Sequence, residues 1–156
     1  MTSLRKTAAI VGVYEHGTRY APDKSELQIQ GESAIRALED AGFSKKDVDG
    51  LFTSSMTTRS SALNLADYLN LEPKYIDNTS VGGASFEFHL SHALAAISSG
   101  RIKCALITYG SLARSASVAI GTGGFSRFNT QILDPSPHSF EELYGLTPVG
   151  LYAMVA

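Results

Sequence analysis

Several kinds of residue are scarce in this chain of 156 residues, and each scarcity argues against a class of protein. Cys104 is the only cysteine, so no internal disulfide can form, and four histidines spread over more than a hundred positions do not form a zinc cluster. With 13 basic against 15 acidic residues and no basic run longer than Lys45 and Lys46, neither nucleic acid nor an anionic membrane is an expected partner. The apolar stretches are interrupted well short of membrane-spanning length.

The remaining composition is that of one globular domain. Apolar residues make up 44% of the chain and charged residues 18%. A chain of this length buries roughly two thirds of its unfolded surface, which is enough for a core without metal or disulfide. The first residues, Met1 to Lys6, are too short and too polar for a secretory signal. We therefore expect a soluble, cytoplasmic protein.

The first part of the chain alternates between short β-branched runs and longer amphipathic stretches, a βαβα order. Residues 7–13 (TAAIVGV) predict a buried strand, followed by a polar loop. A capping box of Ser25 and Gln28 predicts the start of a helix that Gly42 ends. The order then predicts a strand at 50–54, a helix around 62–69, a strand at 75–79, a helix at 84–98 and a strand at 102–109.

This order predicts a layered α/β fold with a mostly parallel sheet and right-handed crossovers. Regular periodicity stops after Ser111, so we expect an α/β core over residues 1–111 and the start of a loop region over 112–156. Pro148 can open a further helix, but no closing signal precedes Ala156, so the sequence reads as interrupted.

The stretch from Asp77 to Gly100, DNTSVGGASFEFHLSHALAAISSG, is the most informative. A predicted strand passes through Gly82 and Gly83 directly into an apolar helix. The first amides of such a helix carry about half a positive charge and can stabilise a carboxylate, a phosphate or a developing oxyanion. The simpler interpretation is that the two glycines only permit a tight turn.

Four segments give the chain a resemblance to the thiolase superfamily, in particular to sterol carrier protein x-type thiolases. They are AAIVGVYEHGTRYAPDKSELQ, ALEDAGFSKKDVDGLFTSS, VGGASFEFHLSHALAAISSG with the following CALITYGS, and ELYGLTPVGLYAM. The resemblance implies the first half of a duplicated α/β/α fold. It also implies a homodimer across residues 75–79 and a nucleophilic cysteine in the turn before the central helix, acylated by an acyl-CoA.

The nucleophile's position in that pattern falls on Gly83, where no thiol is present. Cys104 belongs to the strand after the helix and does not replace it. One branch of the superfamily also lacks the cysteine: aldolases that cleave steroid side chains from a β-hydroxyacyl-CoA with an OB-fold partner protein. The resemblance therefore implies an enzyme that acts on acyl-CoA and makes or breaks a carbon–carbon bond. The missing cysteine favours an aldolase-like lyase. It implies no cofactor other than the coenzyme A of the substrate.

Ser85 is the nearest hydroxyl to the vacant position, which makes Gly83 and Ser85 the candidate catalytic residues. Ser85, His89 and His92 share one helical stripe, so a Ser–His pair is conceivable. No carboxylate is in sight to orient the imidazole, and a metal would lack a third ligand, so we expect packing and interface roles for the histidines. Two weaker patterns have simple interpretations: Gly121 to Gly124 predict a flexible loop, and Glu141 and Glu142 a solvated face. The loop from Tyr14 to Tyr20 can contact substrate or a partner subunit. The alternative function is a non-catalytic module that binds acyl-CoA or lipid, or supports an active partner subunit.

Overall fold

The computed structural model describes residues 6–55, 58, 60–112, 115 and 153. The chain divides into two compact units, residues 1–18 with 23–111 and residues 19–22 with 112–156. In the second unit the Ala21 amide donates a hydrogen bond to Ser115 Oγ over 2.8 Å. The predictions for the motif at 121–124 and for Glu141 and Glu142 lie outside the described residues, and so does the helix after Pro148 except for Ala153, which is helical. All named helices and strands belong to the first unit.

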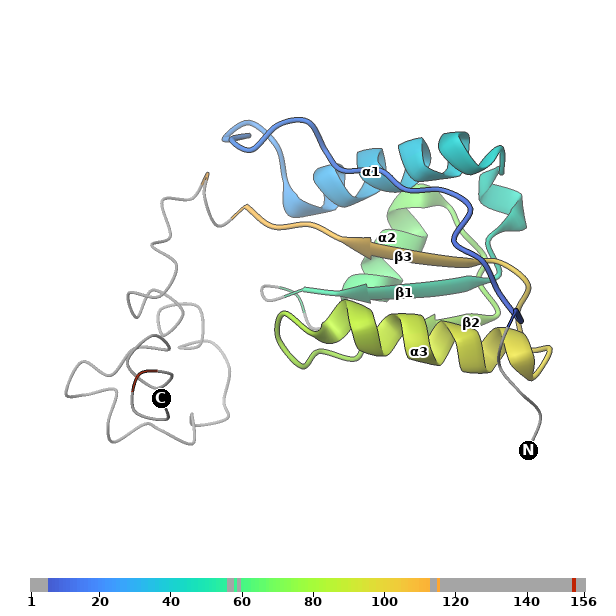
Figure 1. Cartoon of the computed structure of the whole chain (residues 1–156). Coiled ribbons are helices and arrows are strands. Elements are labelled where there is room, and N and C mark those ends of the chain that lie inside the picture. Colours follow the sequence, from blue (N-terminus) through green and yellow to red (C-terminus); the bar gives the residue numbers. More distant parts are fainter. Residues whose placement is uncertain (1–5, 56–57, 59, 113–114, 116–152, 154–156) are drawn as a thin grey trace. The chain divides into compact units, whose positions relative to one another are not determined.

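The first unit is built on a parallel three-stranded sheet with the order β2-β1-β3 (Figure 1). The strands are β1 (Gly50–Ser54), β2 (Tyr75–Asp77) and β3 (Ala105–Tyr109). Helix α2 (Ser61–Leu69) connects β1 to β2, and α3 (Ser85–Ser98) connects β2 to β3. The predicted parallel α/β arrangement is confirmed, with β2 and β3 shorter than the sequence indicates.

Helix α1 (Glu26–Ala41) begins and ends where its signals predict. The Gln28 amide donates to Ser25 Oγ over 3.1 Å, and the Ser25 amide donates to Gln28 Oε1 over 2.7 Å. Gly42 ends the helix with φ of +70°, a conformation that glycine adopts without a steric penalty. A single 3-10 turn, η1 (Lys45–Asp47), leads into β1.

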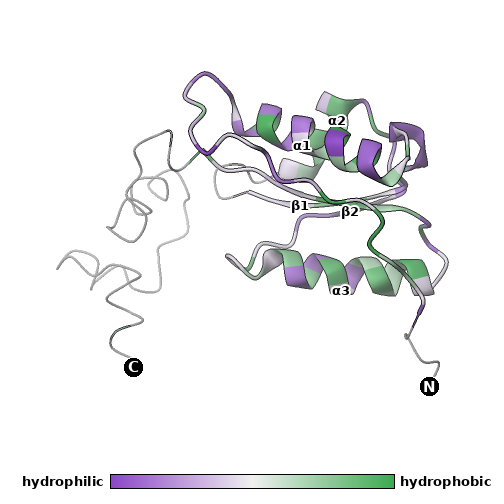
Figure 2. Ribbon diagram, turned by 45° about the horizontal axis from the view of Figure 1, so that its top comes forward, coloured by the Kyte–Doolittle hydropathy of each residue, from purple (hydrophilic) through white to green (hydrophobic). Residues whose placement is uncertain are grey.

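The helices cover both faces of the sheet, with α1 and α2 on one side and α3 on the other (Figure 2). Consecutive residues of β1 pack against the helices on opposite faces of the sheet. Leu51 packs in the cluster with α1 and α2, while Phe52 packs with Ala93 and Ala96 of α3. Both side chains are fully buried, as expected for a central parallel strand covered on both faces.

Asp49 ties together the starts of the three strands. Its carboxylate accepts hydrogen bonds from the amides of Lys103 and Cys104, and its carbonyl accepts from those of Lys74 and Tyr75. The chain entering β1 is thereby fixed to those entering β2 and β3.

The strand predicted at residues 7–13 is wrong. The segment has no regular secondary structure, and Ile10 and Val13 are 73% and 70% exposed. The described sheet has the order β2-β1-β3, and the segment pairs with neither of its two outer strands. The segment is attached to α1 instead: the Val13 amide donates to Asp40 Oδ2 over 2.9 Å, and a Cβ on Gly12 would lie 2.3 Å from the carbonyl oxygen of Ala37.

Candidate functional site

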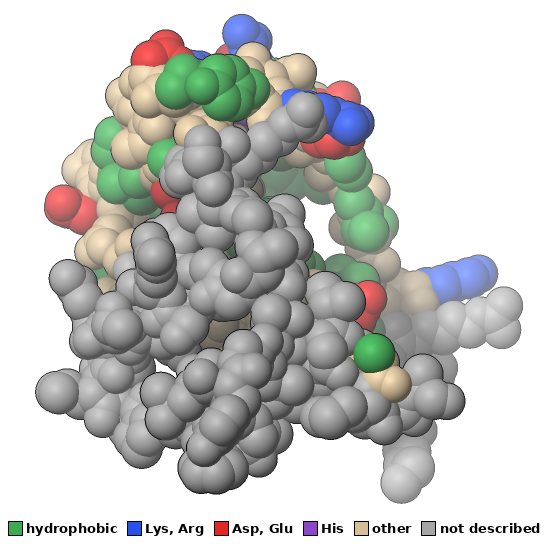
Figure 3. Space-filling model, turned by 90° about the vertical axis from the view of Figure 1, so that its left-hand side faces the viewer, with side chains coloured by type: hydrophobic (Ala, Val, Ile, Leu, Met, Phe, Trp, Pro, Cys, Tyr) green, Lys and Arg blue, Asp and Glu red, His purple; other side chains and the backbone are tan. Residues whose placement is uncertain are grey.

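The turn that opens α3 lies at the edge where the carboxyl ends of the parallel strands meet, on the left in Figure 1 and facing the viewer in Figure 3. Gly82 has φ of +78°, and both Gly82 and Gly83 are exposed. A Cβ built on either glycine would meet no atom within 4 Å. Ligands of open parallel sheets collect at this edge, and here the backbone is accessible to them.

No side-chain hydrogen bond caps the N-terminus of α3, where Ala84 occupies the N-cap position. The contrast is with α1, whose first amides are satisfied by the box of Ser25 and Gln28. An uncapped helix start presents amide donors and a partial positive charge to whatever approaches it. The turn therefore combines open space with the electrostatics that an oxyanion requires.

Ser85 holds this turn together. Its hydroxyl donates to the carbonyl oxygen of Gly82 over 2.6 Å and accepts from the Val81 amide over 3.0 Å. The side chain is fully buried. In this geometry the hydroxyl positions the backbone of Gly82 and Gly83, and a chemical role for Ser85 remains a prediction.

His89 is not paired with Ser85, because each side chain takes a backbone partner. His89 Nε2 donates to the carbonyl oxygen of Thr79 over 2.9 Å, while Nδ1 has no hydrogen-bond partner among the described residues. The ring is fully buried, with the ring centroids of Phe86 and Phe52 at 5.9 and 6.3 Å. His89 is thus a packed core residue that links α3 to the chain after β2.

His92 has a carboxylate partner that the sequence analysis missed. Its Nδ1 lies 2.6 Å from Asp77 Oδ2, so the expectation that no carboxylate orients an imidazole on this helix is wrong. The two residues are 15 positions apart, and the crossover from β2 to α3 brings them together. The signal in the sequence that could have identified this partner is an aspartate at the end of a strand that is followed by the helix carrying the histidine.

The pKa of Asp77 is lowered in the fold. Burial alone would raise it, but hydrogen bonds from Thr79 and His92 together with the charge of His92 outweigh that effect. The Thr79 amide donates to Asp77 Oδ1 over 2.8 Å, so both oxygens are bound. Asp77 is therefore an ionised anchor for the His92 ring.

The pair borders a shallow hollow of about 400 Å³ between β2 and α3. Its other lining residues are Tyr75, Ala95, Ala96, Ser99 and Arg101. His92 is seven residues beyond the start of α3, about 10 Å at the usual helical rise. The hollow and the glycine turn are therefore separate places on the helix.

Cys104 lies just before β3, at the amino end of the strand and thus at the opposite edge from the glycine turn. Burial raises the pKa of its thiol, and the negative charges of Asp49 and Asp47 raise it further. A thiol in this environment is a poor nucleophile. The structure gives it no access to the turn that opens α3.

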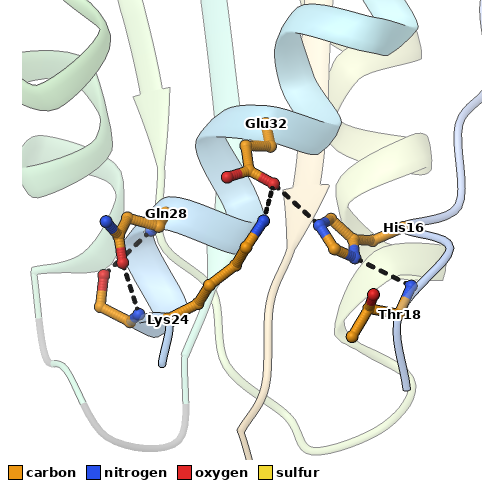
Figure 4. A network of polar contacts seen from close by, with 6 residues as sticks. His16, Thr18, Lys24, Gln28 and Glu32 are labelled. Atoms are coloured by element: carbon orange, nitrogen blue, oxygen red, sulfur yellow. Dashed lines mark hydrogen bonds and ion pairs between the residues drawn. The ribbon is translucent and has the colours of Figure 1, made fainter. Parts of the chain in front are cut away.

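A second polar network fixes the loop after residue 13 to α1 (Figure 4). Glu32 accepts from Lys24 and from His16 Nε2, the latter over 2.9 Å, and these contacts lower the pKa of the Glu32 carboxyl. The Thr18 amide donates to His16 Nδ1 over 3.2 Å, so His16 is the tautomer protonated on Nε2. The network accounts for the position of His16 without a ligand.

Two features are absent from the described residues. None of their helices is long and apolar enough to cross a membrane. No group of three or more histidine, cysteine, aspartate or glutamate side chains among them is arranged to hold a metal ion.

No family model matches the chain. Among curated proteins it is 30% identical over 158 residues to a steroid side-chain-cleaving aldolase from Thermomonospora curvata, an alignment covering 100% of this chain and 40% of that protein. It is 28% identical over 156 residues to a 17-hydroxy-3-oxo-4-pregnene-20-carboxyl-CoA lyase from Mycobacterium tuberculosis, covering 96% of this chain and 39% of that protein. The chain thus spans about two fifths of the length of these relatives.

The fold of the chain is also similar to the folds of solved structures. An Ltp2-ChsH2(DUF35) aldolase superposes with a TM-score of 0.68 at 24% identity, covering 94% of this chain and 36% of that one. A monomeric SCP2-thiolase like protein from Mycobacterium smegmatis superposes with a TM-score of 0.53 at 22% identity, covering 63% of this chain and 22% of that one. The chain therefore has a layered α/β fold like that of a solved aldolase and of a solved thiolase-like protein, and its sequence is similar to that of an aldolase that cleaves steroid side chains.

Proposed function

We propose that this chain forms part of an aldolase-like lyase of the thiolase superfamily, which breaks or makes a carbon–carbon bond beside the thioester of an acyl-CoA. The observation that carries the proposal is Gly83, which lies bare and open at the uncapped start of α3. The names of the two curated relatives, an aldolase that cleaves steroid side chains and a CoA lyase, support this class of reaction. Ordinary thiolysis would need a thiol that this turn does not have.

In the cleavage direction the substrate is a β-hydroxyacyl-CoA. A base removes the hydroxyl proton, the bond between the α and β carbons breaks, and the electron pair passes into the thioester as an enolate. Protonation of the α carbon then gives a shortened acyl-CoA and an aldehyde or ketone. Negative charge develops on the thioester oxygen, and the amides of Gly83 and Phe86 are the donors we assign to it, since those of Ser85 and Glu87 already bond the carbonyl oxygens of Gly82 and Ala84. No covalent acyl-enzyme is needed.

Ser85 has a positioning role in this proposal. Its two hydrogen bonds hold Val81 and Gly82 in the geometry that leaves Gly83 exposed. Loss of the hydroxyl would displace the amide donors by relaxing the turn, and small displacements of such donors reduce catalysis strongly. The base that takes the hydroxyl proton is not assigned to a residue.

The proposed enzyme is a cytoplasmic homodimer that works with a second protein and needs no cofactor besides the coenzyme A of its substrate. Strand β2 pairs only with β1 within the described sheet, which leaves its outer edge open for a copy of the chain. The solved aldolase that superposes over 94% of this chain carries two component names, Ltp2 and ChsH2(DUF35), which supports a partner protein of the OB-fold kind named by the sequence resemblance.

The test is to incubate the full chain, with and without such a partner, with β-hydroxyacyl-CoA thioesters and to measure the released carbonyl compound by mass spectrometry. We expect carbonyl release without a covalent adduct on the protein. Gly83→Cys is the matched variant, since the site has room for the side chain, and gain of acylation there would support the placement of the nucleophile's position. A covalent acyl group on the unmodified chain would contradict the proposal.

A non-catalytic role is the alternative, and one observation favours it: the turn offers no exposed nucleophile, since Gly83 has no side chain and Ser85 is buried. In that case the chain would bind acyl-CoA or lipid and support an active subunit. Tight acyl-CoA binding without turnover, even with the partner protein present, would select this alternative.

A further inference from the structure

We infer that Phe86 and Tyr109 form an aromatic wall beside the glycine turn that recognises the apolar acyl part of the substrate and selects bulky acyl groups over short ones. The inference rests on the proposed function and adds to it the residues that set acyl specificity.

The two rings come from different elements and touch. Phe86 is in the first turn of α3, Tyr109 is the last residue of β3, and their ring centroids are 4.9 Å apart at an interplanar angle of 58°. Such tilted contacts are favourable for aromatic pairs. The pair therefore joins the end of the strand to the start of the helix.

This wall lies next to the proposed reaction site. Phe86 follows Gly83 by three residues, less than one helical turn. Tyr109 is paired in register with Ser54 at the carboxyl ends of β3 and β1, the edge to which the turn also belongs. An acyl chain whose thioester meets the amides near Gly83 would thus have the aromatic pair within its reach.

The wall is available to a ligand. Tyr109 is 45% exposed, Phe86 is half-buried, and Val81 on the other side of the glycines is 49% exposed. Flat aromatic surfaces bury large areas of a rigid apolar group, whereas a two-carbon acyl group is too small to cover them.

The phenol of Tyr109 is a second element of the wall, because it places one polar group at the end of an otherwise apolar surface. Tyrosine combines an apolar ring with a hydrogen-bonding tip. Comparison of Tyr109→Phe with Tyr109→Ala separates the two contributions. We assign recognition to the ring, so the phenylalanine variant should retain it.

The experiment uses the full chain and measures binding of a polycyclic acyl-CoA and of acetyl-CoA. Cleavage is measured with a β-hydroxyacyl-CoA that carries a polycyclic group on its β carbon and with 3-hydroxybutyryl-CoA as the short substrate. Tyr109→Ala should weaken binding of the polycyclic thioester about tenfold and leave acetyl-CoA binding within about twofold, the scale of a lost apolar contact in a specificity pocket. Tyr109→Phe should stay within about threefold of the unmodified protein for both. Tyr68→Ala removes another tyrosine, 50% exposed and on α2, and should change neither.

The outcomes separate this inference from the proposed function. Equal losses for both thioesters, or no loss for either, would overturn the role of the wall even if the protein cleaves its substrate. Selective loss of polycyclic acyl binding in a protein that cleaves nothing would support the wall and count against the lyase. If Tyr109→Phe weakened binding of the polycyclic thioester as much as Tyr109→Ala, recognition would depend on the hydroxyl and not on the ring. That result would overturn the assignment.

Discussion

Asp77 and His92 are joined by a contact of 2.6 Å between Oδ2 and Nδ1, which connects the last residue of β2 to the middle of α3. The contact belongs to the packing of an edge strand on its crossover helix. Asp77 is mostly buried and His92 is partly exposed, so the interaction is stronger than a surface ion pair and weaker than a fully desolvated one.

Asp77→Asn should destabilise the chain by about 1–2 kcal/mol at neutral pH, because it removes a charged acceptor from the Thr79 amide and the His92 ring. The pKa of Asp77 is lowered below its model-compound value of 3.8, so its contribution is present above that pH and is lost as the pH falls through the folded-state value. Urea unfolding at pH 7 and at pH 3 should show a difference between variant and parent that shrinks in acid. Asp67→Asn, on the exposed side of α2, is the control.

Gly83→Cys should fold with nearly the stability of the parent, since a side chain there meets no atom within 4 Å. The introduced thiol would sit at the start of α3, where the helix favours the thiolate, whereas burial raises the pKa of Cys104. We expect alkylation by iodoacetamide to be at least about tenfold faster at position 83, followed by peptide mass spectrometry. Equal rates at the two positions would show that the turn is not open.

Gly12→Ala is the contrasting glycine substitution. Its Cβ would lie 2.3 Å from the carbonyl oxygen of Ala37 and 2.8 Å from the Ala41 Cβ, so the segment must move away from α1. Overpacking of this kind costs about 1–3 kcal/mol. Thermal unfolding should show a lowered midpoint, and Gly17→Ala, whose site is open, should leave it unchanged.

Ser85→Ala should cost about 1–3 kcal/mol, because the turn loses two hydrogen bonds: the Val81 amide loses its acceptor, and the Gly82 carbonyl keeps only the Ser85 amide as donor. The loss should be accompanied by faster amide hydrogen exchange at residues 81–85, measured by mass spectrometry. Ser98→Ala, near the exposed end of the same helix, loses one bond to the Leu94 carbonyl and should change stability by less than about 0.5 kcal/mol. Similar effects in the two variants would argue that Ser85 does not hold the turn.

Asp49→Ala should be more destabilising than Asp49→Asn, because the asparagine keeps one acceptor oxygen for the amides of Lys103 and Cys104. Hydrogen bonds to a charged group are worth about 1.5–3 kcal/mol, which sets the expected loss for the alanine variant. Chemical denaturation of both variants, with the parent, gives the comparison. If the asparagine variant were the less stable of the two, its amide oxygen would not be replacing the carboxylate as acceptor for these amides.

Local signals in the sequence were sufficient for the helices. Ser25, Gln28 and Gly42 set the ends of α1 through hydrogen bonds and a backbone conformation that involve only near neighbours. The double glycine before α3 was equally readable, and so was the absence of a thiol at Gly83. These features depend on residues within a few positions of one another, which periodicity and capping rules describe.

Periodicity and capping rules do not predict contacts between distant parts of the chain. The run at residues 7–13 has the composition of a buried strand, yet it joins neither outer strand of the described sheet and lies exposed along α1, where the Val13 amide bonds Asp40. The partner of His92 was missed for the same reason, since Asp77 reaches it only when β2 packs beside α3.

The sequence alone therefore determined the order of helices and strands from α1 onward, the parallel sheet and the absence of a side chain at Gly83 before α3. Tertiary structure decided which hydroxyl and imidazole groups remain available to a ligand and which form hydrogen bonds within the fold. Ser85 and His89 lie on one helical stripe, but the turn and the chain after β2 supply them with backbone partners. The physical reason is that a buried polar group must be hydrogen-bonded, and its partner comes from whichever segment packs against it.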